Sequence, residues 1–510
     1  MRRNGTQRDP RAVVLPSAVV PGGDGDAAAI LPRLGQFAPS LTLRRPSLEI
    51  SSPLVATLAL AAMLACCSVL VLVSSAEPTW LVPASSYGFP GWVAGPLHGV
   101  ASALLNAVVN RGGQNDLAMS DGFSVLLIAM TIAYALVLAA ARTLSMRTIG
   151  IAVVVLYLVL FLGPPLQLND VFNYLGYARL GALHHLNPYT HVIAGEQHDP
   201  VYEWTSWHNL ASPYGELFTL LTYPLALVSL PLAYWILKSV TVVLALAFVA
   251  LVYKCACQLG RDPRLAVLFV AVNPIVLLYE VGGFHNDPFM LVPAMAAISL
   301  LLARRYRLAG AVLMVAVAIK FTMVLLLPFL LLAAPAGRKR VQMLIGFVLA
   351  SIPLAIVSVA VFGLTLPNFA QQSRVVTPFS ILNLLGWLIG LGGAAPGLMR
   401  VAEVVLVAVI AFAIARVVRK RLDWLSAAGW CTVALIVSLA WVMPWYVVWL
   451  LPLAAISASA RLRTTALALT VFLVLTFMPL TGTALTSAGI NPMASHVGRA
   501  AASLSRRLAS

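Results

Sequence analysis

The stretch IGIAVVVLYLVLFLG, residues Ile149–Gly163, is followed closely by LNDVFNYLGYARLGALHHLNPYTH, residues Leu168–His191. The first part is almost pure hydrocarbon, and the second opens with Asn169–Asp170 where that run stops. An aspartate at the end of a membrane helix is costly to leave unpaired, so its presence there predicts a functional site. We therefore interpret the rest of the chain as a membrane scaffold that presents this polar segment.

The composition supports a membrane scaffold for the whole chain. Of its 510 residues, 61% are hydrophobic and 10% are charged, whereas soluble domains carry about 25% charged residues. Apolar runs of about 18 residues or more recur, and each is long enough to cross the hydrocarbon core as a helix. Because these runs do not alternate between apolar and polar residues, we predict an all-α, polytopic transmembrane protein with about 11–13 spans.

The net charge of +16 is a second feature of the composition. A basic balance can indicate a nucleic-acid partner, but in so apolar a chain it is better explained by Arg and Lys in cytoplasmic loops. The five cysteines lie in or beside apolar runs and lack zinc-binding spacing. We therefore expect a cell-membrane protein that binds no nucleic acid.

The distribution of basic residues predicts the domain organisation and the topology. Residues 1–47 form a disordered cytoplasmic tail, residues 48–482 the transmembrane domain, and residues 483–510 a C-terminal tail. The loops 167–230 and 364–400 carry few basic residues, so we place them, with the active site, on the extracytoplasmic face.

Two apolar segments are too short or too broken for ordinary spans. Leu217–Leu230 contains Pro224 and is predicted to lie along the membrane surface. Residues 308–334 lie between two basic clusters, so we predict a hairpin of two short helices with its tip near Lys320.

This topology brings five polar groups to one face of the membrane. An enzyme that uses a lipid-phosphate donor needs a carboxylate to accept a proton, cations to hold the leaving phosphate, and aromatic surfaces for a sugar. The groups are Asp170, His285–Asn286–Asp287, Lys320, Arg374 and Trp445–Tyr446.

Each group also has a purely structural interpretation. Asp170 would serve as a helix cap, and Lys320 would extend to the lipid headgroups. His285–Asn286–Asp287 would be an ordinary turn, and Trp445–Tyr446 part of an interfacial aromatic belt. Five histidines fall in loop 167–230, but none form an i, i+4 pair, so no metal site is expected there.

Several short motifs carry a resemblance to a known family. They are Asp170-Val-Phe-Asn-Tyr174, Asn187-Pro188-Tyr189, Ser212-Pro213-Tyr214-Gly215, His285-Asn286-Asp287, Lys320 and Pro444-Trp445-Tyr446. With this set the chain resembles the integral-membrane glycosyltransferases of the GT-C class. More narrowly, it is similar to the polyprenyl-phosphomannose-dependent α-1,6-mannosyltransferases of mycobacteria and corynebacteria. Glu216 departs from the family pattern, in which an apolar residue or proline is expected.

The resemblance implies a specific reaction. Mannose would pass from polyprenyl-phosphate mannose to a lipid-anchored, lipomannan-type acceptor, with inversion, no cofactor and no metal. Asp170 would be the general base, with Asp287 as second candidate, and Lys320 and Arg374 would bind the donor phosphate. The sugar and acceptor would be bound by Tyr177, Asn187, Tyr214, His285, Asn286, Asp287, Trp445 and Tyr446.

Two other functions remain open at this point. A related transferase would use arabinofuranose or glucose in place of mannose. A lipid-linked sugar transporter or flippase would carry polar groups near the bilayer midplane, on broken helices in paired halves. Here the polar groups gather at one face and no halves repeat, which favours the enzyme.

Overall fold

A computed structural model describes residues 50–76, 91–97, 99–101, 103, 116–167, 169–365 and 374–509. The predicted tail 1–47 lies outside these residues. Every regular element in the described part of the chain is helical, which confirms the all-α prediction.

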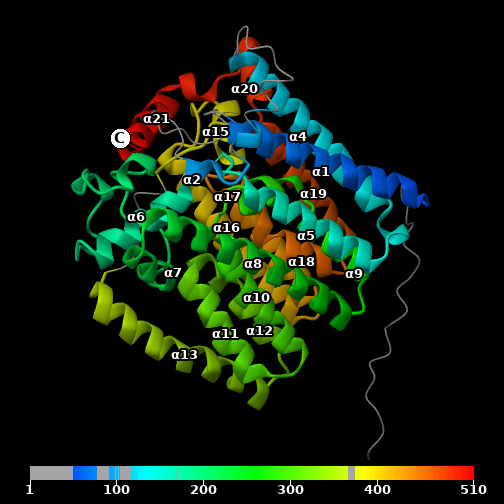
Figure 1. The fold of residues 1–510 in the computed structure, drawn as a ribbon. Coiled ribbons are helices and arrows are strands. Elements are labelled where there is room, and N and C mark those ends of the chain that lie inside the picture. Colours follow the sequence, from blue (N-terminus) through cyan, green and yellow to red (C-terminus); the bar gives the residue numbers. More distant parts are fainter. Residues whose placement is uncertain are drawn as a thin grey trace, which may run out of the picture. The chain divides into compact units, whose positions relative to one another are not determined.

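In the described residues between 53 and 302 there are nine labelled helices, which include both very long and very short elements (Figure 1). They are α1 (Pro53–Ala76), α2 (Gly91–Ala94), α4 (Asp116–Ala139), α5 (Met146–Leu162), α6 (Asp170–Ala182), α7 (Glu216–Thr222), α8 (Leu230–Gln258), α9 (Pro263–Ala271) and α10 (Asp287–Leu302).

The second half continues in the same manner and ends in an amphipathic helix. Its labelled helices are α11 (Tyr306–Ile319), α12 (Leu327–Ala333), α13 (Arg338–Phe362), α15 (Ile381–Leu388), α16 (Pro396–Val418), α17 (Trp424–Ser438), α18 (Leu451–Ile456), α19 (Ala460–Thr476), α20 (Pro479–Ser487) and α21 (His496–Ala509).

Membrane-spanning character is clear in the longest helices. Five in the described part of the chain, α1, α4, α8, α13 and α16, are long and apolar enough to cross a membrane, and the pair α19 and α20, bent by 71°, would make a sixth. Seven further apolar helical segments are shorter. The chain is therefore a polytopic helical membrane protein, while the predicted total of about 11–13 spans stays a prediction.

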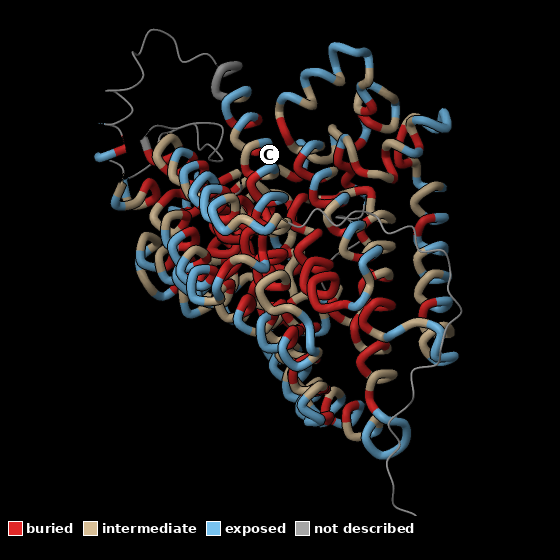
Figure 2. The backbone as a smooth tube through the Cα atoms, turned by 90° about the vertical axis from the view of Figure 1, so that its right-hand side faces the viewer, coloured by how far each residue is buried: buried red, intermediate tan, exposed pale blue. Residues whose placement is uncertain are grey.

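Burial separates the central helices from the outer ones. Figure 2 shows buried backbone gathered in the interior and exposed backbone on peripheral helices. Only 6% of the apolar window of α13 is buried, against 44% for α8. Large apolar side chains are exposed along both α13 and α16, for example Ile356 and Val404. Such faces suit a hydrocarbon solvent, because lipid imposes no penalty on exposed apolar groups.

The interior is built from helices that pack in sequence. α10 packs against both α8 and α11, and α11 packs against α13. The apolar segment between α8 and α10 is divided into α9 and a π-helical turn, η5 (Val276–Val281). Asn273 lies between these two pieces, where its buried amide donates to Tyr134 and Thr470 and its Oδ1 accepts from the Ile275 N–H. The break therefore leaves its polar groups satisfied.

The predicted interruption near Lys320 is confirmed. α11 ends at Ile319, Lys320 adopts an extended conformation, and a 3₁₀ segment, η6 (Phe321–Leu326), leads into α12. The short apolar piece at 217–230 is also separate from the following span, because α7 and a 3₁₀ turn precede α8.

Candidate active site

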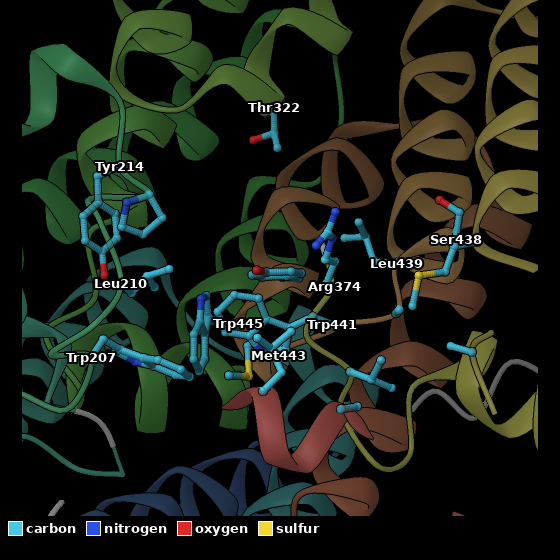
Figure 3. A pocket seen from close by; sticks show the side chains of 18 of the residues that line it. Trp207, Leu210, Tyr214, Thr322, Arg374, Ser438, Leu439, Trp441, Met443 and Trp445 are labelled. Carbon is cyan, nitrogen blue, oxygen red and sulfur yellow. The ribbon is translucent and has the colours of Figure 1, made fainter. Parts of the chain in front are cut away.

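A cavity of about 1230 Å³ brings together side chains from distant parts of the chain (Figure 3). Most of the predicted site residues line it: Asp170, Tyr177, Tyr214, His285, Lys320, Arg374, Trp445 and Tyr446. Asn187, Asn286 and Asp287 are not among its lining residues.

Asp170 is the first residue of α6 and faces the cavity. Its Oδ1 accepts a hydrogen bond from the Tyr214 hydroxyl at 2.8 Å. The N-cap position belongs to Asn169, whose side chain bonds to Ser206 and the Trp204 carbonyl. The Asp170 carboxylate therefore points to a partner outside its own helix, which the capping interpretation does not require.

Tyr214 is held in place by an unusually close backbone approach. A Cβ atom on Gly215 would lie 2.4 Å from the carbonyl oxygens of Ala318 and Ile319, so only glycine lets this loop touch the end of α11. Burial, and then the negative charge of Asp170, raise the pKa of Tyr214 well above its ordinary value. Its hydroxyl therefore keeps the proton that it donates to Asp170.

Asp287 is the centre of a buried network behind the cavity wall. Its side chain is fully buried, and its Oδ1 accepts from Lys320 Nζ and Trp449 Nε1, both at 2.7 Å. Its Oδ2 lies 2.6 Å from His285 Nδ1. Because three contacts already occupy the carboxylate, Asp287 fixes the cavity-lining side chains of Lys320, His285 and Trp449.

Lys320 is anchored inside the protein. Besides its ion pair with Asp287, its Nζ lies 5.1 Å from the centroid of a Trp449 ring. Its side chain is 20% exposed. These contacts direct the ammonium group to the cavity, so the structure gives no support to the headgroup interpretation.

Arg374 lines the same cavity. In Figure 3 its side chain lies between Thr322 and Trp445. Asn187 is placed elsewhere: its amide donates to the Phe362 carbonyl at 2.6 Å and to Thr365 Oγ1 at 3.1 Å. Asn187 thus connects the segment between α6 and α7, residues 183–215, to the end of α13. We call this segment the long loop.

Glu216, the residue that departs from the family pattern, also meets α13. It begins α7, and its carboxylate accepts a hydrogen bond from Ser358 of α13. The presence of a polar residue at position 216 therefore has a structural explanation, because Ser358 is its hydrogen-bond partner.

The long loop is braced by an ion network around Asp199. Arg179 Nε donates to both carboxylate oxygens, at 2.8 and 3.0 Å, and His184 Nε2 lies 2.8 Å from Oδ2. Burial raises the pKa of Asp199, but the hydrogen bonds from Arg179 and His184 outweigh it and leave the pKa below its ordinary value. At least one loop histidine therefore has a structural role.

Sequence reasoning missed several residues of the cavity. The indoles of Trp207, Trp441 and Trp449 line it, as do Arg400 and Glu403 of α16. They were missed because single aromatic and charged residues inside apolar segments have no local motif.

The final helix, α21, is the largest element that sequence reasoning left without a role. It lines the cavity with His496, Val497, Ala500, Ala501, Leu504 and Arg507. The Asn209 N–H donates to the Leu508 carbonyl at 3.0 Å, which ties α21 to the long loop. The helical spacing of these residues was the available signal.

Together these features define a polytopic helical membrane protein with a large cavity that joins a carboxylate, cations and aromatic rings. The chain belongs to the α-(1→6)-mannopyranosyltransferase family. Residues 65–336 match the N-terminal domain of that family, and residues 378–506 match the MptB C-terminal domain.

Two curated relatives are both described as α-(1→6)-mannopyranosyltransferase A. The Corynebacterium glutamicum protein is 23% identical over 274 residues, which is 45% of this chain and 52% of the relative. The Mycobacterium tuberculosis protein is 27% identical over 254 residues, 44% of this chain and 48% of the relative. The matches thus span about half the length of each relative. No solved structure matches the chain.

Proposed function

We propose that the protein transfers mannose from polyprenyl-phosphate mannose to a lipid-anchored mannan-type acceptor, forming an α-1,6 linkage with inversion. The reaction would take place at the extracytoplasmic face of the cell membrane. Family membership supports the sugar and the linkage. The observation that carries the chemistry is the Asp170 carboxylate, fixed by Tyr214 in the cavity that also contains Lys320.

Asp170 would act as the general base. The acceptor hydroxyl loses its proton to the carboxylate as its oxygen forms a bond to C1 of mannose. The bond between C1 and the phosphate oxygen breaks on the opposite face, so a β-linked donor gives an α-linked product. The hydrogen bond from Tyr214 occupies Oδ1 and leaves Oδ2 for the acceptor.

Asp287 is poorly suited to the role of base. It is fully buried, does not line the cavity, and already accepts from Lys320 and Trp449. Its three contacts suit a residue that positions others, which supports Asp170 as the base.

Lys320 and Arg374 would stabilise the departing polyprenyl phosphate. An ammonium has three donors, so Lys320 retains donors for phosphate while it is paired with Asp287. A guanidinium binds phosphate oxygens in a bidentate manner, and Arg374 reaches the cavity with no hydrogen bond to another described residue. In a water-poor cavity such contacts lower the barrier as charge develops on the leaving group.

Aromatic rings near Lys320 would hold the mannose. Tyr446 stacks on Trp449 with ring centroids 4.4 Å apart, and Trp445 lies beside His285 at 4.5 Å. The cavity continues along α16 past Met399 to Leu406. The apolar members of this wall, Met399 and Leu406, would contact the polyprenyl chain beside the charged Arg400 and Glu403, since the apolar window of α16 is only 11% buried.

The proposal is tested with purified protein in detergent, radiolabelled polyprenyl-phosphate mannose and a synthetic oligomannoside. We expect a longer oligosaccharide with a new α-1,6 bond, identified by methylation analysis. Transfer only from arabinofuranose or glucose donors would refute the mannose assignment. Movement of the donor across a liposome bilayer without transfer would refute the enzyme.

A further inference from the structure

Three side chains near the start of α10 converge at the cavity wall, which His285 lines. Glu280, His285 and Asp287 each offer one ligand atom, and these atoms lie within 4.8 Å of one another. All three residues are buried. Asp287 and His285 have roles in the network already described, but Glu280 does not.

Glu280 is a buried carboxylate whose hydrogen-bonding needs are unmet. The residue is 2% exposed, and neither Oε1 nor Oε2 has a hydrogen-bond partner among the described residues. Its Oε1 faces His285 Nδ1 at 3.9 Å, too long for a hydrogen bond. An unpartnered buried carboxylate is costly, so each such group calls for an explanation.

The backbone of the turn is shaped so that these groups meet. Glu280 lies in the π-helical segment η5, a conformation that is rare and frequent at functional sites. Phe284 follows with a φ of 52°, which is uncommon for a residue other than glycine. A Cβ on Gly283 would lie 2.4 Å from the Tyr279 carbonyl oxygen, so glycine is required there.

Charge balance also leaves room for a cation. Of the two acidic residues, Glu280 and Asp287, only Asp287 forms an ion pair with Lys320. Asp287 Oδ1 is engaged by Lys320 and Trp449, whereas Oδ2 is turned to His285 Nδ1. Only the Glu280 oxygens are unengaged, and they lie beside an imidazole nitrogen and a carboxylate oxygen that contact each other. Two carboxylates and one imidazole form a donor set that suits Zn²⁺ or Mn²⁺.

We infer that Glu280, His285 and Asp287 bind a divalent transition-metal cation of the zinc or manganese type. On binding, any proton held on the ligating atoms of Glu280 and His285 is released to solvent through the cavity that His285 lines, and the contact between His285 and Asp287 is replaced by bonds from both residues to the metal. The ion adds positive charge beside Lys320 and fixes the turn that carries His285. This effect on Lys320 and His285 rests on the proposed function, whereas metal binding itself does not depend on that function.

Metal binding is measured on full-length protein without an affinity tag. The protein is treated with chelator, dialysed, and titrated with MnCl₂ or ZnCl₂ while bound metal and melting temperature are followed. We expect about one tightly bound ion per chain and a higher melting temperature, since a ligand that binds only the folded state stabilises it. In the Mn²⁺-loaded parent, electron spin echo modulation should show one imidazole nitrogen.

Glu280→Gln keeps the side-chain shape and removes a ligand charge, so affinity should fall at least about tenfold. Asp170→Asn is the matched control, because it removes a cavity carboxylate outside the trio and should bind metal as the parent does. Equal affinity of parent and Glu280→Gln, or a parent that binds neither ion, would overturn the inference. A parent protein that binds the metal but shows no mannose transfer would count against the proposed function alone.

Discussion

The hydroxyl of Tyr214 donates a 2.8 Å hydrogen bond to Asp170 Oδ1, joining residues 44 positions apart in the chain. Tyr214 belongs to the loop that Gly215 presses against α11, and Asp170 begins α6. The bond therefore connects α6 to a loop that contacts the end of α11, where Lys320 follows, and so fixes the carboxylate relative to Lys320.

The first prediction concerns Asp170→Asn. Asparagine keeps the shape and accepts the Tyr214 hydrogen bond but cannot take a proton, so transfer should slow by at least about a hundredfold. Donor affinity and melting temperature should match the parent, and Asp121→Asn in α4 is the control. Turnover within a few-fold of the parent at equal expression would remove Asp170 from the role of base.

The second prediction concerns Tyr214→Phe. Phenylalanine keeps the ring packed on Tyr174 but removes the hydrogen bond to Asp170. Since a hydrogen bond to a charged group contributes about 1.5–3 kcal/mol, kcat should fall by about tenfold or more. Tyr202→Phe, whose ring stacks on His208, serves as control. If Tyr214→Phe and the control have the same kcat, the bond does not position the base.

The third prediction compares two substitutions of Lys320. Lys320→Ala removes the contact to the leaving phosphate and should lose much more activity than Lys320→Arg, which keeps the charge. Because Lys320→Ala also leaves Asp287 without its cation, melting temperature is measured alongside turnover. Near-normal turnover of a folded Lys320→Ala protein would show that Lys320 does not bind the phosphate.

The fourth prediction concerns topology. In intact cells, an impermeant thiol reagent should label Thr190→Cys in the long loop and leave Lys339→Cys unlabelled. Both positions are exposed, so accessibility to water does not distinguish them. Cys257 is exposed and is replaced by serine in the background. Equal labelling of the two positions would contradict the assigned sides of the membrane.

The fifth prediction is a pH dependence that originates at Asp199. Its pKa is lowered in the folded protein, so its stabilisation is present above the unfolded value, about 3.9, and is lost as the pH falls through the folded value. The melting temperature of the parent should exceed that of Asp199→Asn at pH 5, and the difference should narrow toward pH 3. A difference that grows with acidity would show that the folded pKa is raised instead.

Local sequence patterns predicted several elements of this fold. Ile149–Gly163 is apolar enough to predict α5, because hydrocarbon surroundings force a run of that kind to satisfy its backbone within a helix. The basic clusters on both sides of residues 308–334 predicted the interruption between α11 and η6. Asp170 stood out because an ionisable group beside hydrocarbon is too costly to occur without a purpose.

The tertiary structure decided which polar groups face the cavity and which lie behind it. Asp287 and His285 are near neighbours in sequence, yet only His285 of the two lines the cavity, and Asp287 lies behind it. The π-helical turn η5 brings Glu280 close to His285 and Asp287. The helix α21 lines the same cavity as Asp170, although the two are more than 300 residues apart in the sequence. Periodicity and composition act over a few residues, whereas these contacts depend on how separate helices pack, which no local pattern encodes.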